Sequence, residues 1–595
     1  MTQRQATDHP ATKTTPRSLR TPTGNPASLR CEEARRVVRQ AREQLASTPA
    51  RVDPRPFGEA VIDWLDPHGL WSASPDAPVA PAIRRRARDL VAELESNDPA
   101  AACPAAQEIG EWLGIWVREL RAIAVKAEEN AKAMTPAEAV SLASSPIFEE
   151  GPIQRPAREL AGEMGRRLGV IEKTLGHPVK DAVDAAMSRT FPDDDVVWSD
   201  VLLGAAVRAY LPQIDPHGGW APYEEETSLY EVDLEAVPPP RLWRKMRRTV
   251  LGVRVEEASN KTLQPGDVVL SVADIPTACL SVEQAEQLSI IDVEPGAPAS
   301  QPVMVLSKND TAPRAIQVNF AGEAHTSETP SAEGDAPDER TARGYDFTRL
   351  RYGEGEVVVI PIGDVPDDLG DELAATLARA RQSPFEGIIL DLRGNGGGST
   401  DGAAAAIGLF LPGAQLFPLR RRDGSIEVDR AATPPVIDRW TGPLAVLVDG
   451  DTASAAEMIA GALGAYHRAP ILGSRTFGKG CAQEYLEDDI HAGVLRLTTL
   501  VYALPDGSPV QRTGIQPWIT IPMAKSPEKE AMLLRSMAPW SGPDVRTEAL
   551  VHEIPWPRHG NHVGPCKDTV VCKALRALGP EARFARSERD GQHRR

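Results

Sequence analysis

Ser454 is a candidate nucleophile because of the elements predicted on either side of it. Residues 443–448 form an apolar run typical of a buried strand, and a helix of small residues is predicted to begin near Ala453. The N–H groups in the first turn of a helix have no partner within it, so the N–H of Ala455 could bind an acyl oxyanion. Serine is also a common helix cap, and capping remains the alternative.

Lys479 is a candidate general base. It lies between two glycines in the segment RTFGKGCAQ, residues 475–483. A lysine accepts a proton only as the neutral amine, which requires burial to lower its pKa from about 10.4 towards 7–8. Gln483 would share a face with Lys479, and its side-chain oxygen could orient the amine. The alternative is a solvated loop lysine.

A glycine-rich run, residues 394–398, directly follows the predicted strand 387–392. Glycines let backbone N–H groups come close to a bound anion. The run does not end in Gly-Lys-Ser/Thr and fails the dinucleotide fingerprint at its last glycine. A nucleotide-phosphate loop is therefore not indicated.

Together these segments resemble the C-terminal processing (tail-specific) peptidases. The resemblance covers about residues 251–523, and the interval from Ser454 to Lys479 is the family's 25 residues. The matching stretches are DLRGNGGG at 391–398, TASAAEMIAGAL at 452–463, RTFGKGCAQ at 475–483 and GIQP at 514–517.

The resemblance implies a serine endopeptidase with a Ser–Lys dyad. Ser454 would be the nucleophile, Lys479 the base and Gln483 the residue that orients the lysine. The N–H groups of Gly398 and Ala455 would form the oxyanion hole. No metal and no organic cofactor is implied.

The fold class expected is α+β with several domains. Strands alternate with helical patterns in the catalytic part, which indicates an α/β layer, and the resemblance implies a crotonase/ClpP-like fold for it. The expected order is a disordered tail (1–30), a helical region (31–236), a divergent PDZ-like domain (237–320), a linker (321–344), the catalytic domain (345–525) and an extension of unknown role (526–595).

The PDZ-like module would select substrates by their C-terminus. Leu251, Gly252 and Val253 stand where the family has its carboxylate-binding loop, and PDZ domains hold a terminal carboxylate on backbone N–H groups. The segment from Val253 to Leu263 is short for the family, which leaves the specificity of the groove open.

The pattern D-P-H-G-x-W occurs twice, at 66–71 and 215–220. Its Asp and His could be metal ligands. Asp-Pro is also a turn that ends helices and Trp a buried anchor, and we expect this structural role. The second copy resembles the D-P-H segment that precedes the PDZ domain in the family.

Three positions depart from the family or offer alternatives. Trp518 stands where the family usually has Asp, and Ala465 where some members have Asp. His467 is an alternative base, but it lies more than three helical turns beyond Ser454 and is expected to be structural.

Composition limits the partners. A net charge of −18 over 595 residues argues against nucleic-acid binding. The expected partners are protein or peptide substrates with an accessible C-terminus, and the oligomeric state is left open. Neither a signal peptide nor a membrane-spanning run is seen, so the chain is expected to be cytoplasmic, with export, as in most of the family, as the alternative.

The six cysteines give no zinc pattern and no disulfide framework. Only Cys566 and Cys572 are close in sequence, and they are interpreted as two unrelated thiols, with a small disulfide as the alternative. The alternative function is a catalytically silent protein on the same fold that binds a hydrophobic ligand or a peptide, as the interphotoreceptor retinoid-binding proteins do.

Overall fold

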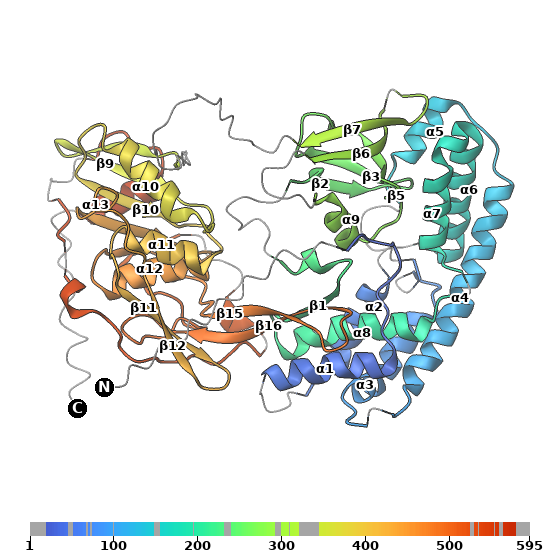
Figure 1. The fold of residues 1–595 in the computed structure, drawn as a ribbon, viewed down its shortest axis with the longest axis horizontal. Helices are drawn as coiled ribbons and strands as arrows, with labels where there is room; N and C mark the ends of the chain where they lie inside the picture. The colour runs from blue at the N-terminus through green and yellow to red at the C-terminus, as the bar shows by residue number, and fades with distance from the viewer. Residues whose placement is uncertain are drawn as a thin grey trace, which may run out of the picture.

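The computed structural model of the chain places three groups of elements. Helices and a small β-module lie together in one lobe, and the predicted catalytic domain forms a second lobe (Figure 1). The residues described are 20–45, 51–66, 70–71, 74–98, 100–147, 155–193, 195–230, 240–291, 299–308, 310–320, 344–523, 529–533, 535–552, 554–557 and 563–578.

Among the residues described, eight α-helices form the predicted N-terminal helical region around a single core of apolar side chains. They are α1 (Cys31–Leu45), α2 (Pro54–Leu65), α3 (Val79–Leu94), α4 (Pro104–Glu129), α5 (Pro136–Ala143), α6 (Ala157–Leu175), α7 (Lys180–Thr190) and α8 (Trp198–Ile214). In α4 the side chains of Ile109, Leu113, Val117 and Leu120, which recur at helical spacing, are fully buried.

The two D-P-H-G-x-W segments end helices, as expected. Helix α2 stops at Leu65 and α8 at Ile214, each directly before the Asp of the motif. Trp71 and Trp220 are buried and donate their indole N–H to the carbonyl of Thr190 and to Asp488. Residues 67–69 of the first copy lie outside the described residues.

The β-module contains an antiparallel sheet in the order β2-β3-β4-β6-β7, with β5 beside β4. Its elements are β2 (Trp243–Arg248), β3 (Val253–Ala258), β4 (Val268–Val272), β5 (Ile275–Pro276), α9 (Val282–Ser289), β6 (Ala299–Leu306) and β7 (Arg314–Phe320). Its own apolar core includes Trp243, Val255 and Val305.

The catalytic part is built on a six-stranded sheet in the order β17-β14-β13-β10-β9-β8. All pairs are parallel except β8 with β9. The strands are β8 (Thr348–Tyr352), β9 (Gly355–Pro361), β10 (Gly387–Asp391), β13 (Leu444–Val448), β14 (Ile471–Gly473) and β17 (Ile519–Thr520).

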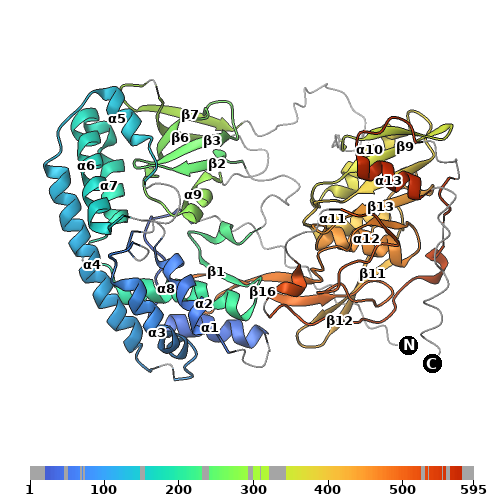
Figure 2. The same cartoon turned by 180° about the vertical axis from the view of Figure 1, so that it is seen from behind.

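Both faces of this sheet are covered. Helices α10 (Leu369–Ala380), α11 (Thr400–Gly408) and α12 (Ala455–Ala465) pack on one face, and the C-terminal helix α13 (Thr569–Ala577) packs on the other (Figure 2). Buried parallel strands are apolar on both faces, which is why 387–391 and 444–448 read as continuous apolar runs. The extension of unknown role thus supplies one layer of the catalytic domain.

A second sheet connects the two lobes. It contains β11 (Gln415–Arg421), β12 (Ile426–Arg430), β15 (Cys481–Glu487) and β16 (Gly493–Tyr502). The outer strand beside β16 is β1 (Gly219–Pro222), which follows α8 (Figure 1). Leu495 and Leu497 of β16 belong to the core of the helical region, so the two lobes share buried apolar surface.

Part of the predicted tail is packed. Residues 1–19 and 321–343 lie outside the described residues, but residues 20–30 run along the helical region. Leu29 is 1% exposed and its N–H donates to the carbonyl of Asp200 at 2.9 Å. The prediction of disorder is therefore wrong for residues 20–30. The local sequence did not show this, because Leu29 packs against residues far along the chain.

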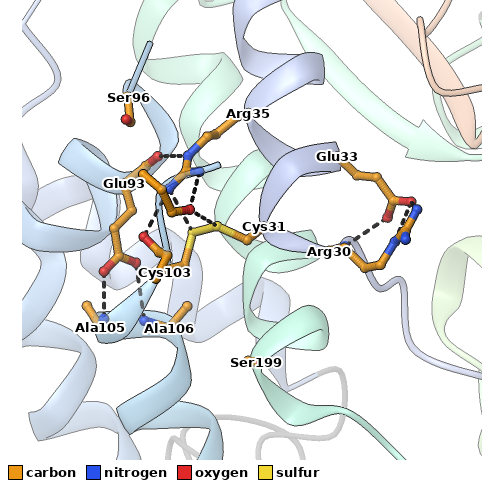
Figure 3. The surroundings of a disulfide bond; sticks show 12 residues. Arg30, Cys31, Glu33, Arg35, Glu93, Ser96, Cys103, Ala105, Ala106 and Ser199 are labelled. Carbon is orange, nitrogen blue, oxygen red and sulfur yellow. Dashed lines mark hydrogen bonds and ion pairs between the residues drawn. A yellow bond between two sulfur atoms is a disulfide. The ribbon is translucent and has the colours of Figure 1, made fainter. Parts of the chain in front are cut away.

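Two disulfides correct the interpretation of the cysteines. Cys31 bonds to Cys103 across 72 residues, and Cys566 bonds to Cys572. Near the first, Arg35 is 1% exposed and donates to the carbonyl of Glu93, whose carboxylate accepts the first N–H groups of α4 (Figure 3). Because Cys31 and Cys103 are 72 residues apart, no local sequence pattern indicated that they pair. Cys279 and Cys481 are buried thiols.

None of the helices placed in the described ranges combines the length and the apolar character needed to cross a bilayer.

Candidate active site

Ser454 occupies the turn between strand β13 and helix α12. Its backbone has φ 52° and ψ −123°, in the left-handed region that residues other than glycine rarely adopt. Such strain clusters at functional sites, where the surrounding structure must hold it. The side chain is half-buried, and the residues on both sides of it are buried.

The glycine-rich loop after β10 touches this turn. Gly397 has φ 104°, and a Cβ built on it would lie 2.6 Å from the Cβ of Ser454 and 2.9 Å from the nitrogen of Ala455. Only glycine therefore permits this approach. The buried Asn395 fixes the loop, because its carbonyl accepts from the N–H of Ala453 at 2.9 Å and its side chain accepts from the N–H of Gly397 at 2.8 Å.

Two N–H groups beside Ser454 are available for an oxyanion. Across the described ranges, the N–H groups of Gly398 and Ala455 form no hydrogen bond, whereas that of Gly397 is taken by Asn395. Ala455 is the first residue of α12, where the partial positive charge of the helix N-terminus adds to the N–H dipole. The predicted oxyanion residues thus lie next to the predicted nucleophile.

Lys479 lies on the loop between β14 and β15, and its backbone is held against that of Ser454. The N–H of Phe477 donates to the carbonyl of Thr452 at 2.9 Å. The hydroxyl of the buried Tyr502 lies 3.2 Å from the carbonyl oxygen of Ser454 and 3.1 Å from that of Lys479. The lysine side chain is half-buried.

Glu457, in the first turn of α12, joins the same two segments. Its fully buried carboxylate accepts from the N–H groups of Ser454 at 3.1 Å, Lys479 at 2.8 Å and Gly478 at 2.8 Å, and from the hydroxyl of Thr476. Burial raises the pKa of Glu457 to about 7, against the donated hydrogen bonds, which lower it. Glu457 was not among the residues predicted from the sequence, because a Glu three positions after a capping residue is ordinary.

The predicted contact of Gln483 with Lys479 is not formed. The amide of Gln483 donates instead to the hydroxyl of Thr498 at 3.2 Å and weakly to the sulfur of Cys481 at 3.7 Å. Thr498 donates in turn to the buried Asp215, by its hydroxyl at 2.8 Å and its N–H at 2.6 Å. The second D-P-H-G-x-W segment therefore reaches β16, the strand that pairs with β15 beside Gln483.

The side chains of Ser454 and Lys479 are likewise not joined by a hydrogen bond among the described residues. Their backbones are held together by the contacts of Phe477, Glu457 and Tyr502. Catalytic hydrogen bonds often tighten only when substrate binds. His467 is exposed beyond the end of α12 and lies against Trp518, which agrees with a structural role.

The C-terminal extension braces the catalytic loops, a role that the sequence did not reveal. The ammonium group of Lys529 donates to the carbonyls of Gly450 at 2.8 Å, Thr476 at 3.1 Å and Arg475 at 3.2 Å. These carbonyls belong to the two loops that lead to Ser454 and to Lys479. One ammonium group thus forms hydrogen bonds to carbonyl oxygens of both loops.

The predicted carboxylate-binding loop is buried. Leu251 lies in the core of the helical region and Val253 in the core of the β-module. Gly252 packs against the backbone of Val269, and both its N–H and its carbonyl bond to Thr249. Binding of a substrate carboxylate at these three residues stays a prediction.

Comparison with known proteins identifies the domain that carries this geometry. Residues 356–521 match the model of peptidase family S41. This part of the chain is an S41 peptidase domain. It contains Ser454, Lys479 and the glycine-rich loop, and its topology is the alternating one expected from the sequence.

Curated relatives share this domain. A probable CtpA-like serine protease of Staphylococcus aureus (strain COL) is 30% identical over 172 residues, which are 29% of this chain and 34% of the relative. A carboxy-terminal-processing protease of Bartonella bacilliformis is 37% identical over 138 residues, 23% of this chain and 31% of the relative. The chain thus covers about a third of the length of these relatives.

Similar solved structures include two that are matched over most of their own length. A photosystem II D1 C-terminal processing protease is 18% identical, with a TM-score of 0.32 over 60% of this chain and 91% of its own. Mature CPAF complexed with lactacystin is 14% identical, with a TM-score of 0.26 over 59% of this chain and 89% of its own.

Proposed function

We propose that the chain is a serine endopeptidase in which Ser454 is the nucleophile and Lys479 the general base. The observation that carries the proposal is the position of Ser454. It occupies a strained strand-to-helix turn inside the S41 domain, beside the two free N–H groups of Gly398 and Ala455. Capping alone explains neither the strained backbone nor the approach of the glycine loop.

The proposed reaction uses Ser454, Lys479 and the two N–H groups. The neutral amine of Lys479 takes the proton of the Ser454 hydroxyl as the oxygen attacks a peptide carbonyl, and the N–H groups of Gly398 and Ala455 stabilise the oxyanion. The ammonium then protonates the leaving amine, which leaves an ester on Ser454. The amine next deprotonates a water molecule, and hydrolysis of the ester releases the acid and restores the serine.

Gln483 has a positioning role in this proposal. Its amide is fixed by Thr498, which is fixed in turn by Asp215. The amide oxygen then remains to accept from the ammonium of Lys479 once the lysine side chain has rotated. In this proposal Gln483 makes the contact with Lys479 that was predicted from the sequence, and Thr498 and Asp215 hold its amide in place.

We infer that substrates are proteins or peptides selected through an accessible C-terminus. Supporting this are the β-module that precedes the S41 domain and the relative named as a carboxy-terminal-processing protease. The burial of Leu251, Gly252 and Val253 means that capture of a carboxylate there requires this loop to open.

The test is proteolysis of a disordered protein by wild type and by Ser454→Ala, with products identified by mass spectrometry. We expect Ser454→Ala to lose at least about a thousandfold in kcat/KM, since removal of a catalytic nucleophile leaves only the residual effect of the oxyanion hole. Unchanged cleavage by the variant would reject the proposal. The same substrate with an amidated C-terminus tests selection: a loss in kcat/KM supports it, and equal rates exclude it.

We further propose that the chain works in an oxidising compartment, in place of the cytoplasm expected from the sequence. Two disulfides support this, because such bonds persist outside the reducing cytosol. Titration of thiols in the denatured, unreduced protein should find the two free cysteines, Cys279 and Cys481. Detection of all six thiols in protein taken from its native source would contradict the proposal.

A further inference from the structure

Three side chains with different ligand chemistry lie close together at the start of β15. The imidazole of His217, the thiol of Cys481 and the carboxylate of Glu530 have ligand atoms that all lie within 4.8 Å of one another. They come from the second D-P-H-G-x-W segment, from the start of β15 and from the 3-10 helix Glu530–Met532. The sequence offered His217 as a possible metal ligand, but Cys481 and Glu530 lie far along the chain, so no sequence pattern joined the three residues.

The cluster is buried except at His217. Cys481 is 2% and Glu530 0% exposed, whereas the His217 side chain is 19% exposed and is the point where solvent touches the cluster. Burial raises the pKa of the Cys481 thiol to about 12, so it is protonated without a metal and is not a nucleophile in its own right. A bound cation would displace this proton.

The carboxylate is already oriented by its neighbours. Oε1 of Glu530 accepts from the amide of Gln511 at 2.7 Å and from the hydroxyl of Ser536, and Oε2 lies 3.0 Å from Nε2 of His217. Gln511 is fully buried and also accepts from the N–H of Gly480 at 2.7 Å. In metal sites, residues that do not bind the ion typically orient a ligand carboxylate through hydrogen bonds.

We propose that His217, Cys481 and Glu530 bind one zinc ion. Imidazole, thiolate and carboxylate are zinc ligands with bond lengths of about 2.0–2.3 Å, and tetrahedral geometry sets ligand atoms about 3.4–3.8 Å apart. Closing the cluster from 4.8 Å therefore requires side-chain movements of about 1 Å. Thiolate and imidazole disfavour Mg²⁺ and Ca²⁺, and three protein ligands leave a fourth position for water.

The ion would connect three parts of the chain that the catalytic geometry depends on. His217 follows Asp215, which holds Thr498 and through it Gln483. Cys481 lies two residues after Lys479, and Glu530 follows Lys529, which braces both catalytic loops. The competing explanation is a hydrogen-bonded pair of His217 and Glu530 that satisfies a buried carboxylate, with Cys481 as an apolar neighbour.

Metal binding by the full chain separates these explanations without reference to activity. The protein is stripped with a chelator, dialysed against micromolar zinc chloride and analysed for zinc, and its thermal midpoint is measured with and without zinc. Cys279→Ala is the matched control for Cys481→Ala, because Cys279 is the other buried free cysteine and is not part of the cluster.

We expect about one zinc per chain and a midpoint raised by several degrees in wild type and in Cys279→Ala, because a ligand that binds only the folded state stabilises it. Cys481→Ala should lose both. Cobalt in place of zinc should give a thiolate-to-metal charge-transfer band that Cys481→Ala lacks. Absence of stoichiometric zinc in wild type, or zinc and an unchanged midpoint shift in Cys481→Ala, overturns the proposal. If Cys481→Ala does not fold, the same measurements on Glu530→Gln decide it.

Discussion

Oε2 of Glu457 lies 2.8 Å from the backbone nitrogen of Lys479 and accepts its hydrogen bond. The same oxygen accepts from the N–H of Ser454 at 3.1 Å. One buried carboxylate therefore sets the distance between the backbones of the proposed base and nucleophile. We interpret Glu457 as a positioning residue that touches neither the substrate nor the reacting atoms.

Replacement of Glu457 by Gln should lower kcat by about 10- to 100-fold with little change in KM. The amide NH₂ of Gln would face backbone donors, and each buried donor left unpaired costs about 1–3 kcal/mol. The measurement is steady-state kinetics together with labelling of Ser454 by a serine-reactive phosphonate, which should slow in parallel. The control is Glu427→Gln on the exposed strand β12. Unchanged kcat in a merely less stable variant would show that Glu457 acts only in folding.

The pH dependence of stability should also report on Glu457. Its pKa is raised by burial from its ordinary value of 4.5 to about 7, so between these values the folded protein binds more protons than the unfolded one. The stabilisation is complete below pH 4.5 and is lost as pH rises through 7, by about 3 kcal/mol. The difference in thermal midpoint, wild type minus Glu457→Gln, should therefore fall between pH 4.5 and 7. A difference that rises with pH would mean that the carboxylate is stabilised in its charged form.

The strand-to-helix turn of Ser454 and the glycine loop could be predicted because both are local patterns. The apolar run 444–448 and the small residues after it specify one strand and one helix. Parallel pairing of β10 with β13 then brings both carboxyl ends to the same edge of the sheet. Lys479 was singled out by its place between two glycines, and the family resemblance favoured a catalytic role over that of a solvated lysine.

Contacts between distant segments could not be predicted. Apart from Ser454, the partners of Glu457 lie about twenty residues away, and those of Glu530 lie up to 313 residues from it. The side-chain amide of Gln483 is oriented by Thr498, which is itself held by Asp215. No local sequence pattern indicates that these three residues are in contact. Patterns of spacing locate elements, whereas the polar partner of a buried side chain depends on how those elements pack.

Gly397→Ala should abolish peptidase activity, whereas Gly396→Ala should preserve it within about threefold. A Cβ at Gly397 would lie 2.6 Å from the Cβ of Ser454 and 2.8 Å from the carbonyl oxygen of Ala453, so the loop must move away from the oxyanion site. Gly396, next to it, is exposed, and a Cβ added there would meet no atom within 4 Å. The measurement is kcat/KM with circular dichroism to verify folding. Equal activity of the two variants would contradict the close approach of this loop.

Lys529→Met should lower both activity and stability, because it removes the cation that holds three carbonyls of the catalytic loops while keeping a side chain of similar length. We expect kcat to fall by about tenfold and limited proteolysis to cut faster within residues 449–453 and 474–480. Lys573→Met is the control, since Lys573 is an exposed lysine of α13. Equal behaviour of the two variants would limit the C-terminal extension to covering the sheet, with no part in ordering the site.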